Sequence, residues 1–223
     1  MTELAADVFA YGLAAGLSGS AFLATVILLA TEAGARAAAG LLAGVVLVLA
    51  AAALLAAVAA DIVVGAGGSL VVATLLKLGL GVVLLNLAWR VRPGSEAGPA
   101  LKTKLTGMEA KLAHIGPSQA VRVGIGVAVL PKRFVTTLLA GATIGAVQTT
   151  VGQSLALLTL YLLAATALIW TTLLVYIFGG DRVQAALEHA RGWVMEQAEP
   201  LTFVVALGFG VLFTGQALIE LLL

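Results

Sequence analysis

The sequence predicts an all-α polytopic membrane protein with six transmembrane helices in a 3+3 inverted repeat. Of its 223 residues, 61% are hydrophobic and only 10% are charged, whereas about a quarter of the residues in soluble domains are charged. The 12 basic and 11 acidic side chains cannot cover so much apolar surface, so the solvent of most of the chain is lipid. The apolar runs lack the two-residue alternation of membrane β-strands, so the spans are expected to be helices.

Six apolar stretches approach the roughly 20 residues that a helix needs to cross a bilayer. They are residues 8–30, 37–60, 70–89, 120–146, 151–178 and 201–223. Glu3 and Asp7 precede the first stretch where a secretory signal would carry basic residues, so we expect it to be retained as a span. The chain then divides into a first repeat at 1–92, a cytoplasmic linker at 93–119 and a second repeat at 120–223.

Basic residues outside the spans indicate the orientation in the membrane. They lie between spans one and two, three and four, and five and six: Arg36, Arg90, Arg92, Lys102, Lys104, Lys111, Arg122, Arg182 and Arg191. The other loops and the two ends carry acidic residues but neither Lys nor Arg. Because cytoplasmic loops are rich in Lys and Arg, the pattern predicts a multi-pass protein of the cytoplasmic membrane with both termini outside.

Two of the predicted cytoplasmic segments have a helical apolar stripe. The stripes consist of Leu101, Leu105, Met108, Leu112 and Ile115 in the linker, and of Val183, Leu187, Ala190 and Val194 in the segment 181–199. Apolar residues every three or four positions are typical of an amphipathic helix on the membrane surface. A linker that lies over the ends of the bundle explains each stripe equally well.

Similar stretches recur along the chain and suggest an internal repeat. The third span contains LGLGVVLL at 78–85 and the sixth contains LGFGVLFT at 207–214, an offset of 129. The first and fourth spans align at an offset of 112, which pairs Gly12 with Gly124 and Thr25 with Thr137. A repeat of three spans must have the opposite topology in its second copy, which is an arrangement found in transporters.

The fourth span contains the most informative polar residues, Pro131, Lys132 and Arg133. Lys132 follows Val121 by eleven residues, which places it about 16 Å into the membrane, near the midplane. Proline breaks or kinks a helix, and intramembrane cations are costly and mark functional sites. The pair therefore predicts a site for an anionic group such as phosphate, sulfate or carboxylate. The alternative is that the span begins at Phe134 and leaves both cations at the interface.

Small residues occupy the matching part of the first span. Gly16, Ser18 and Ser20 are candidates to face the cations, because small residues allow local unwinding; the alternative is close helix packing through Gly12 and Gly16. Lys77 in the third span either lines the same cavity or extends its ammonium group to the outer interface.

Several classes of function are disfavoured. The chain has no Cys, which excludes thiolate chemistry and Cys-ligated metals. No carboxylate is committed to the bilayer centre, which counts against a metal site. We expect no catalytic residues, no cofactor and no enzyme activity, since no cluster of acid, base and nucleophile lies at depth. The even charge balance gives no reason to expect a nucleic-acid partner.

The segments KLGLGVVLLNLAWRVRP and GPSQAVRVGIGVAVLPKRFVTTLLAGATIG resemble the peptidoglycolipid-addressing (GAP) family. That family includes sulfolipid-addressing proteins and belongs to the lysine exporter superfamily. Its fourth span holds an Asn-Pro-Lys motif followed by Ala-Gly. Here the motif is Leu130-Pro131-Lys132 followed by Ala140-Gly141, so Pro and Lys are retained and Asn is not. The first span of such proteins commonly has Pro near its centre, whereas this chain has Ser18-Gly19-Ser20.

The resemblance implies export of lipid-like or amphipathic molecules. With the predicted cations, it indicates a transporter for an anionic amphipathic or lipid-linked substrate. Membrane lipids are expected to contact the protein, and a homo-oligomer is compatible with the sequence. An exporter of small solutes such as amino acids is one alternative. A non-transporting membrane subunit that recruits a lipid-synthesis or secretion partner through its basic loop is another.

Overall fold

The computed structural model describes residues 2–17, 19–30, 34–65, 71–90, 92, 112, 115–147, 149–179 and 181–222. Every regular element within these ranges is an α-helix, which confirms the all-α prediction for this part of the chain. The helices are α1 (Thr2–Gly16), α2 (Gly19–Leu29), α3 (Gly34–Gly65), α4 (Val71–Arg90), α6 (Pro117–Ala128), α7 (Pro131–Ala146), α8 (Val151–Ala165), α9 (Ala167–Gly179) and α10 (Asp181–Leu222). The predicted amphipathic helix of the linker falls almost wholly outside the described residues.

One helix is by itself long and apolar enough to cross a membrane, namely α3 over Gly34–Ile62. Three further spans are obtained if each pair of helices joined at a sharp bend counts as one: α1 with α2 (58°), α6 with α7 (73°) and α8 with α9 (65°). The described residues thus support one to four of the six predicted spans. The apolar stretches Gly81–Arg90 and Phe203–Ile219 lie where the other two are predicted, and each is shorter than a full span.

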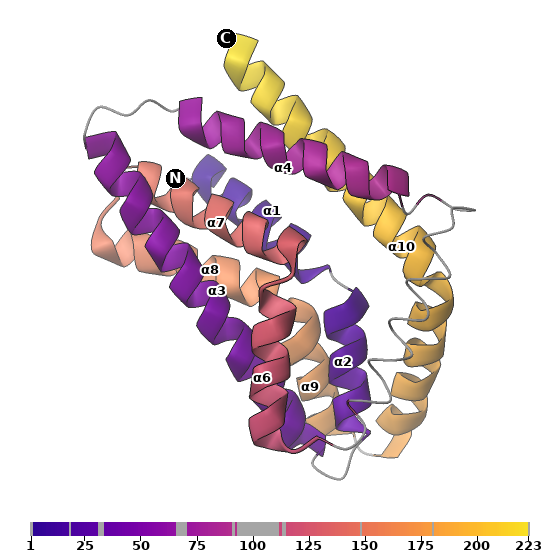
Figure 1. Cartoon of the computed structure of the whole chain (residues 1–223). Coiled ribbons are helices and arrows are strands. Elements are labelled where there is room, and N and C mark those ends of the chain that lie inside the picture. The colour runs from indigo at the N-terminus through magenta and orange to yellow at the C-terminus, as the bar shows by residue number, and fades with distance from the viewer. Residues whose placement is uncertain are drawn as a thin grey trace.

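Two of the predicted segments have features that the sequence did not indicate. The fifth predicted span, 151–178, is divided at Thr166, whose hydroxyl donates a hydrogen bond of 2.7 Å to the Leu162 carbonyl. Such bonds back to the preceding turn favour bending of a helix. The segments 181–199 and 201–223 were expected to be separate, but α10 continues through Pro200. A proline inside a helix costs one backbone hydrogen bond without always ending it, and α10 is visibly curved (Figure 1).

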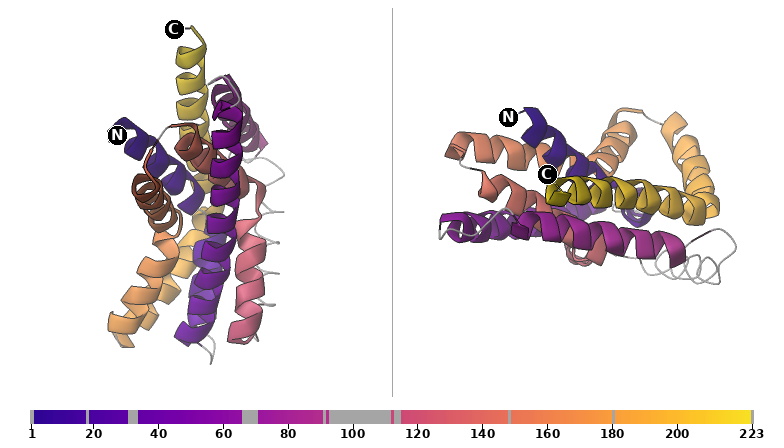
Figure 2. Two further views of the ribbon diagram at one scale, coloured as in Figure 1. Left: turned by 90° about the vertical axis from the view of Figure 1, so that its left-hand side faces the viewer. Right: turned by 90° about the horizontal axis from the view of Figure 1, so that it is seen from above.

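Most helices lie along one or two others (Figure 1). Helix α3 lies along α6 and α7, and α1 lies along α7 and α8. Helices α4 and α10 run side by side, as the view from above shows (Figure 2). Glycines allow the closest approaches: a Cβ atom at Gly124 would meet the Leu41 carbonyl, and one at Gly141 would meet the Ala53 carbonyl. Small residues that let backbones approach are typical of membrane helix contacts.

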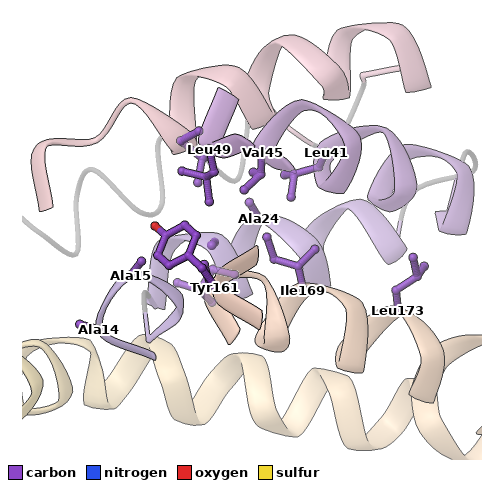
Figure 3. Close-up of a cluster of buried hydrophobic side chains, with 14 of the residues drawn as sticks. Ala14, Ala15, Ala24, Leu41, Val45, Leu49, Tyr161, Ile169 and Leu173 are labelled. Atoms are coloured by element: carbon purple, nitrogen blue, oxygen red, sulfur yellow. The ribbon is translucent and has the colours of Figure 1, made fainter. Parts of the chain in front are cut away.

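A buried apolar cluster joins α3 to α8 and α9. Leu41, Val45 and Leu49 of α3 point toward Tyr161 and Ile169, with Ala24 of α2 between them (Figure 3). These side chains are 0–1% exposed. The cluster fixes α8 and α9 against α3, and it holds Tyr161 close to the first turns of α7.

The two breaks in α1–α2 and α6–α7 occupy matching positions. Helix α1 ends at Gly16 and α6 ends at Ala128, while α2 begins at Gly19 and α7 begins at Pro131. Both differences, 128 − 16 and 131 − 19, equal 112, which is the offset at which the first and fourth spans align in sequence. Hydrogen bonds match as well, because the Thr25 hydroxyl donates to the Ala21 carbonyl and the Thr137 hydroxyl donates to the Arg133 carbonyl.

The contact between α4 and α10 is reciprocal. A Cβ atom at Gly81 would meet Thr214, and one at Gly210 would meet Leu85. Both 210 − 81 and 214 − 85 equal 129, the offset of the LGxGV match. Where a residue of α4 contacts a residue of α10, the repeat counterparts of these two residues therefore contact each other as well. The two helices run antiparallel, and reciprocal contacts of this kind are the pattern of a two-fold axis.

Candidate functional site

The second half of the fourth predicted span begins at Pro131. Pro131 stands at the first helical position of α7 after Leu130, whose backbone is not helical. Proline suits this position because the amide hydrogen that it lacks would have no partner within the helix. No side chain caps this end, so the first turn of α7 presents free backbone N–H groups and the positive end of the helix dipole. This end favours anions.

The two cations after Pro131 contact the end of α1. The Lys132 ammonium (Nζ) donates a hydrogen bond of 3.3 Å to the Leu17 carbonyl, and Nε of Arg133 donates one of 3.1 Å to the Ala15 carbonyl. The last carbonyls of a helix lack partners within it and attract positive charge. Lys132 and Arg133 therefore join the two helix breaks, and each has a structural role.

Arg133 has donors that this structural role does not use. Its side chain is only 3% exposed, and Nη1 and Nη2 are buried without a hydrogen-bond partner among the described residues. A buried N–H group without an acceptor costs free energy, and more so when it is charged. The two terminal nitrogens of a guanidinium group match the paired oxygens of a carboxylate, sulfate or phosphate. An oxyanion would satisfy both.

Hydroxyl groups bind the backbone of Arg133 and link α7 to α8. The Thr137 hydroxyl and the Tyr161 hydroxyl are 2.6 Å apart, and both side chains are fully buried. Thr136 and Thr137 each donate to the Arg133 carbonyl, at 2.8 Å and 2.7 Å. The first turns of α7 are thereby tied to α8, so the position of Arg133 is fixed from two sides.

The structure brings together only part of the predicted set. Gly16 ends α1 beside the cations, and a Cβ atom there would meet the carbonyls of Ala164 and Ala165, which agrees with the close packing given above as the alternative. A contact of Gly16 with a substrate stays a prediction. Ser18 lies outside the described residues. Ser20 and Lys77 lie in α2 and α4, and their side chains fall outside the description. Their contact with a substrate stays a prediction.

Tyr161 and Thr137 were not predicted from the sequence as neighbours of the site. A signal was present, since a tyrosine inside an apolar span usually finds a hydrogen-bond partner for its hydroxyl. No group of three or more His, Asp, Glu or Cys side chains that could hold a metal ion occurs within the described ranges.

Comparison with known families identifies the chain. The family model described as Sap, sulfolipid-1-addressing protein, matches residues 8–219. The chain belongs to the sulfolipid-1-addressing protein family. The match includes both helix breaks and the Lys132–Arg133 pair, and it confirms the family suggested by the third and fourth spans. With its apolar helices, this member of the family is a membrane protein. No curated protein and no solved structure matches the chain.

Proposed function

We propose that this protein moves an anionic amphipathic or lipid-linked molecule across the cytoplasmic membrane, with Arg133 as the group that binds the anion. The observation that carries the proposal is the pair of unpaired, buried Nη nitrogens of Arg133 at the junction of the two helix breaks. A purely structural cation would need only the bond from Nε to the Ala15 carbonyl. The family description names a sulfolipid, which agrees with a lipid substrate that carries an anionic group.

We infer that the architecture is a six-span inverted repeat. The matching breaks at an offset of 112 and the reciprocal contact between α4 and α10 at an offset of 129 support this arrangement. A two-fold axis in the membrane plane would relate the two halves and place the broken helices at their interface, where transporters bind their substrates. One departure from symmetry is the bend at Thr166, which has no counterpart in α3.

The same proposal places both termini outside the cell, on the charge asymmetry of the loops. Because the chain has no Cys, single cysteines can be introduced cleanly. A cysteine at Ser69 is expected to react with a membrane-impermeant thiol reagent in intact cells, whereas a cysteine at Ser95 is expected to react only after lysis. The reverse labelling pattern would show that the topology is inverted.

Cells that lack the protein test the function. We expect an anionic lipid to accumulate on the cytoplasmic side of their membrane, because its outward movement is lost. The wild-type gene and the Arg122→Gln variant, whose side chain is exposed on α6, should restore the distribution, and Arg133→Gln should not. Accumulation of amino acids instead would favour the small-solute exporter, and an unchanged distribution of lipids and solutes would contradict transport.

A further inference from the structure

A groove lies between α3, the end of α7 and the start of α8. Its volume is about 350 Å³, which is within the range of small-molecule sites. Most of its lining is apolar, with Leu54 and Val58 from α3, Ile144 from α7, and Leu155 and Leu158 from α8.

The groove results from small residues at the contact of α3 with α7. A Cβ atom at Gly145 would meet the Ala57 carbonyl, and one at Gly141 would meet the Ala53 carbonyl, so the two backbones touch there. Ala57 and Gly145 also line the groove, and neither has a side chain large enough to fill it. Helix α8 starts at a capping box formed by Thr150 and Gln153, and its side chains form the opposite wall.

The mouth of the groove is apolar and exposed. Leu54 is 47% exposed, Val58 58% and Leu155 54%. Exposed apolar surface of this kind on a helix of a membrane protein faces the hydrocarbon chains of lipids. An exposed apolar mouth of this kind suits the sideways entry of a lipid chain, which a carrier of lipid-like molecules needs.

Polar groups occur at one end of the groove only. Asp61 is exposed near the end of α3, and the Thr149 and Ser154 hydroxyls are 2.7 Å apart. The residues that line the groove include this carboxylate and no Lys or Arg. An anionic headgroup is disfavoured beside Asp61, while an uncharged hydrocarbon chain meets the apolar walls without penalty.

We propose that this groove holds an acyl chain of the transported lipid. The proposal rests on the proposed function in that it assigns the chain to the substrate whose anionic head binds Arg133. Arg133 and Ile144 are eleven residues apart on α7, which corresponds to about 16 Å along the helix. Half of a hydrocarbon core about 30 Å thick is of similar length, so one amphipathic molecule can reach both sites.

Photo-cross-linking in proteoliposomes tests the groove. The probe is a long-chain alcohol with a diazirine near the end of its chain, and labelled peptides are identified by mass spectrometry. We expect Leu54, Val58 and Leu155 to be labelled more strongly than Leu55 and Leu163, which are exposed at 72% and 53% but lie outside the groove. Equal labelling of all five positions would overturn the proposal.

Filling the groove provides the matched comparison. Ala57→Phe is expected to reduce labelling in the groove by at least about fivefold, because the added ring occupies the space that a bound chain requires, and Leu55→Phe is the control. Should Ala57→Phe fail to fold, Leu158→Trp takes its place with Leu163→Trp as control. Labelling that is unchanged by the filling variants would contradict an acyl-chain site.

The charge of the probe gives a second readout. An alkyl sulfate with the same photoreactive chain should label the groove at least about twofold more than the alcohol, because its sulfate group can bind the free Nη nitrogens of Arg133. Arg133→Gln should remove the difference, and equal labelling by the two probes in the wild-type protein would count against the proposed orientation. These measurements detect binding alone, so groove labelling without any transport would refute the proposed function but not the groove. Normal transport by a variant with a filled groove would refute the acyl-chain site but not the proposed function.

Discussion

Replacing Arg133 by lysine is expected to reduce substrate movement by at least about tenfold while most of the stability is retained. A lysine keeps the positive charge and can still donate to the Ala15 carbonyl, which Nε of Arg133 contacts at 3.1 Å, but it has no planar fork. Hydrogen bonds to charged groups contribute about 1.5–3 kcal/mol, and each 1.4 kcal/mol corresponds to about a factor of ten. Translocation rates and melting temperatures in detergent, measured in parallel, test the expected separation of the two effects.

Two other variants complete the comparison. Arg133→Ala should lower both transport and stability, because it also leaves the Ala15 carbonyl without its donor, at a cost of about 1–3 kcal/mol. Lys132→Ala removes the bond to the Leu17 carbonyl and leaves the Arg133 fork intact, so it should affect melting more than transport. From the sequence alone, Lys132→Ala is expected to abolish transport without loss of stability, since removing an intramembrane charge relieves a cost of about 2.5–3.5 kcal/mol. Full transport by Arg133→Lys would mean that the fork is not the anion site.

Alanine at Gly81 or Gly210 is expected to destabilise the protein by about 1–3 kcal/mol, the usual cost of overpacking a well-packed contact. A Cβ atom at Gly81 would lie 2.7 Å from the Thr214 backbone nitrogen, and one at Gly210 would lie 2.9 Å from the Leu85 side chain. Both glycines mediate the reciprocal contact of α4 with α10, so the two substitutions should have similar effects in thermal melting.

Gly79 and Gly208 are the matched controls. A Cβ atom at either position would meet nothing within 4 Å, and each lies two residues before a packed glycine in the same LGxGV match. Alanine there should leave melting unchanged or raise it slightly, because alanine favours the helix by about 1 kcal/mol over glycine. Loss of stability at Gly79 equal to that at Gly81 would contradict the reciprocal contact.

The features that the sequence predicted correctly depend on local chemistry. Composition and the lack of two-residue alternation together predicted the helical class, and proline chemistry predicted the break at Pro131, where α7 begins. The bend at Thr166 could not be predicted in this way, because threonines with the same bond to the preceding turn lie in unbroken stretches of helix as well, such as Thr159 in α8 and Thr172 in α9.

The arrangement of the site depends on contacts between distant segments. Lys132 and Arg133 stand out as costly residues in the sequence, but their carbonyl partners are 115 and 118 residues away. The pairing of Thr137 with Tyr161 likewise requires α7 and α8 to be packed together. No periodicity or spacing along the chain indicates which donors of Arg133 are used by the fold and which remain for a ligand.

The central claim is that Arg133 binds the anionic group of a molecule that the protein carries across the membrane. The most direct measurement is the outward movement of a fluorescent anionic lipid, compared with a zwitterionic lipid of the same chains, in proteoliposomes of the purified protein. We predict that the wild-type protein moves the anionic lipid faster and that Arg133→Lys, incorporated to the same level, removes this preference. Equal movement of both lipids by the wild-type protein, or an undiminished preference in Arg133→Lys, would contradict the claim.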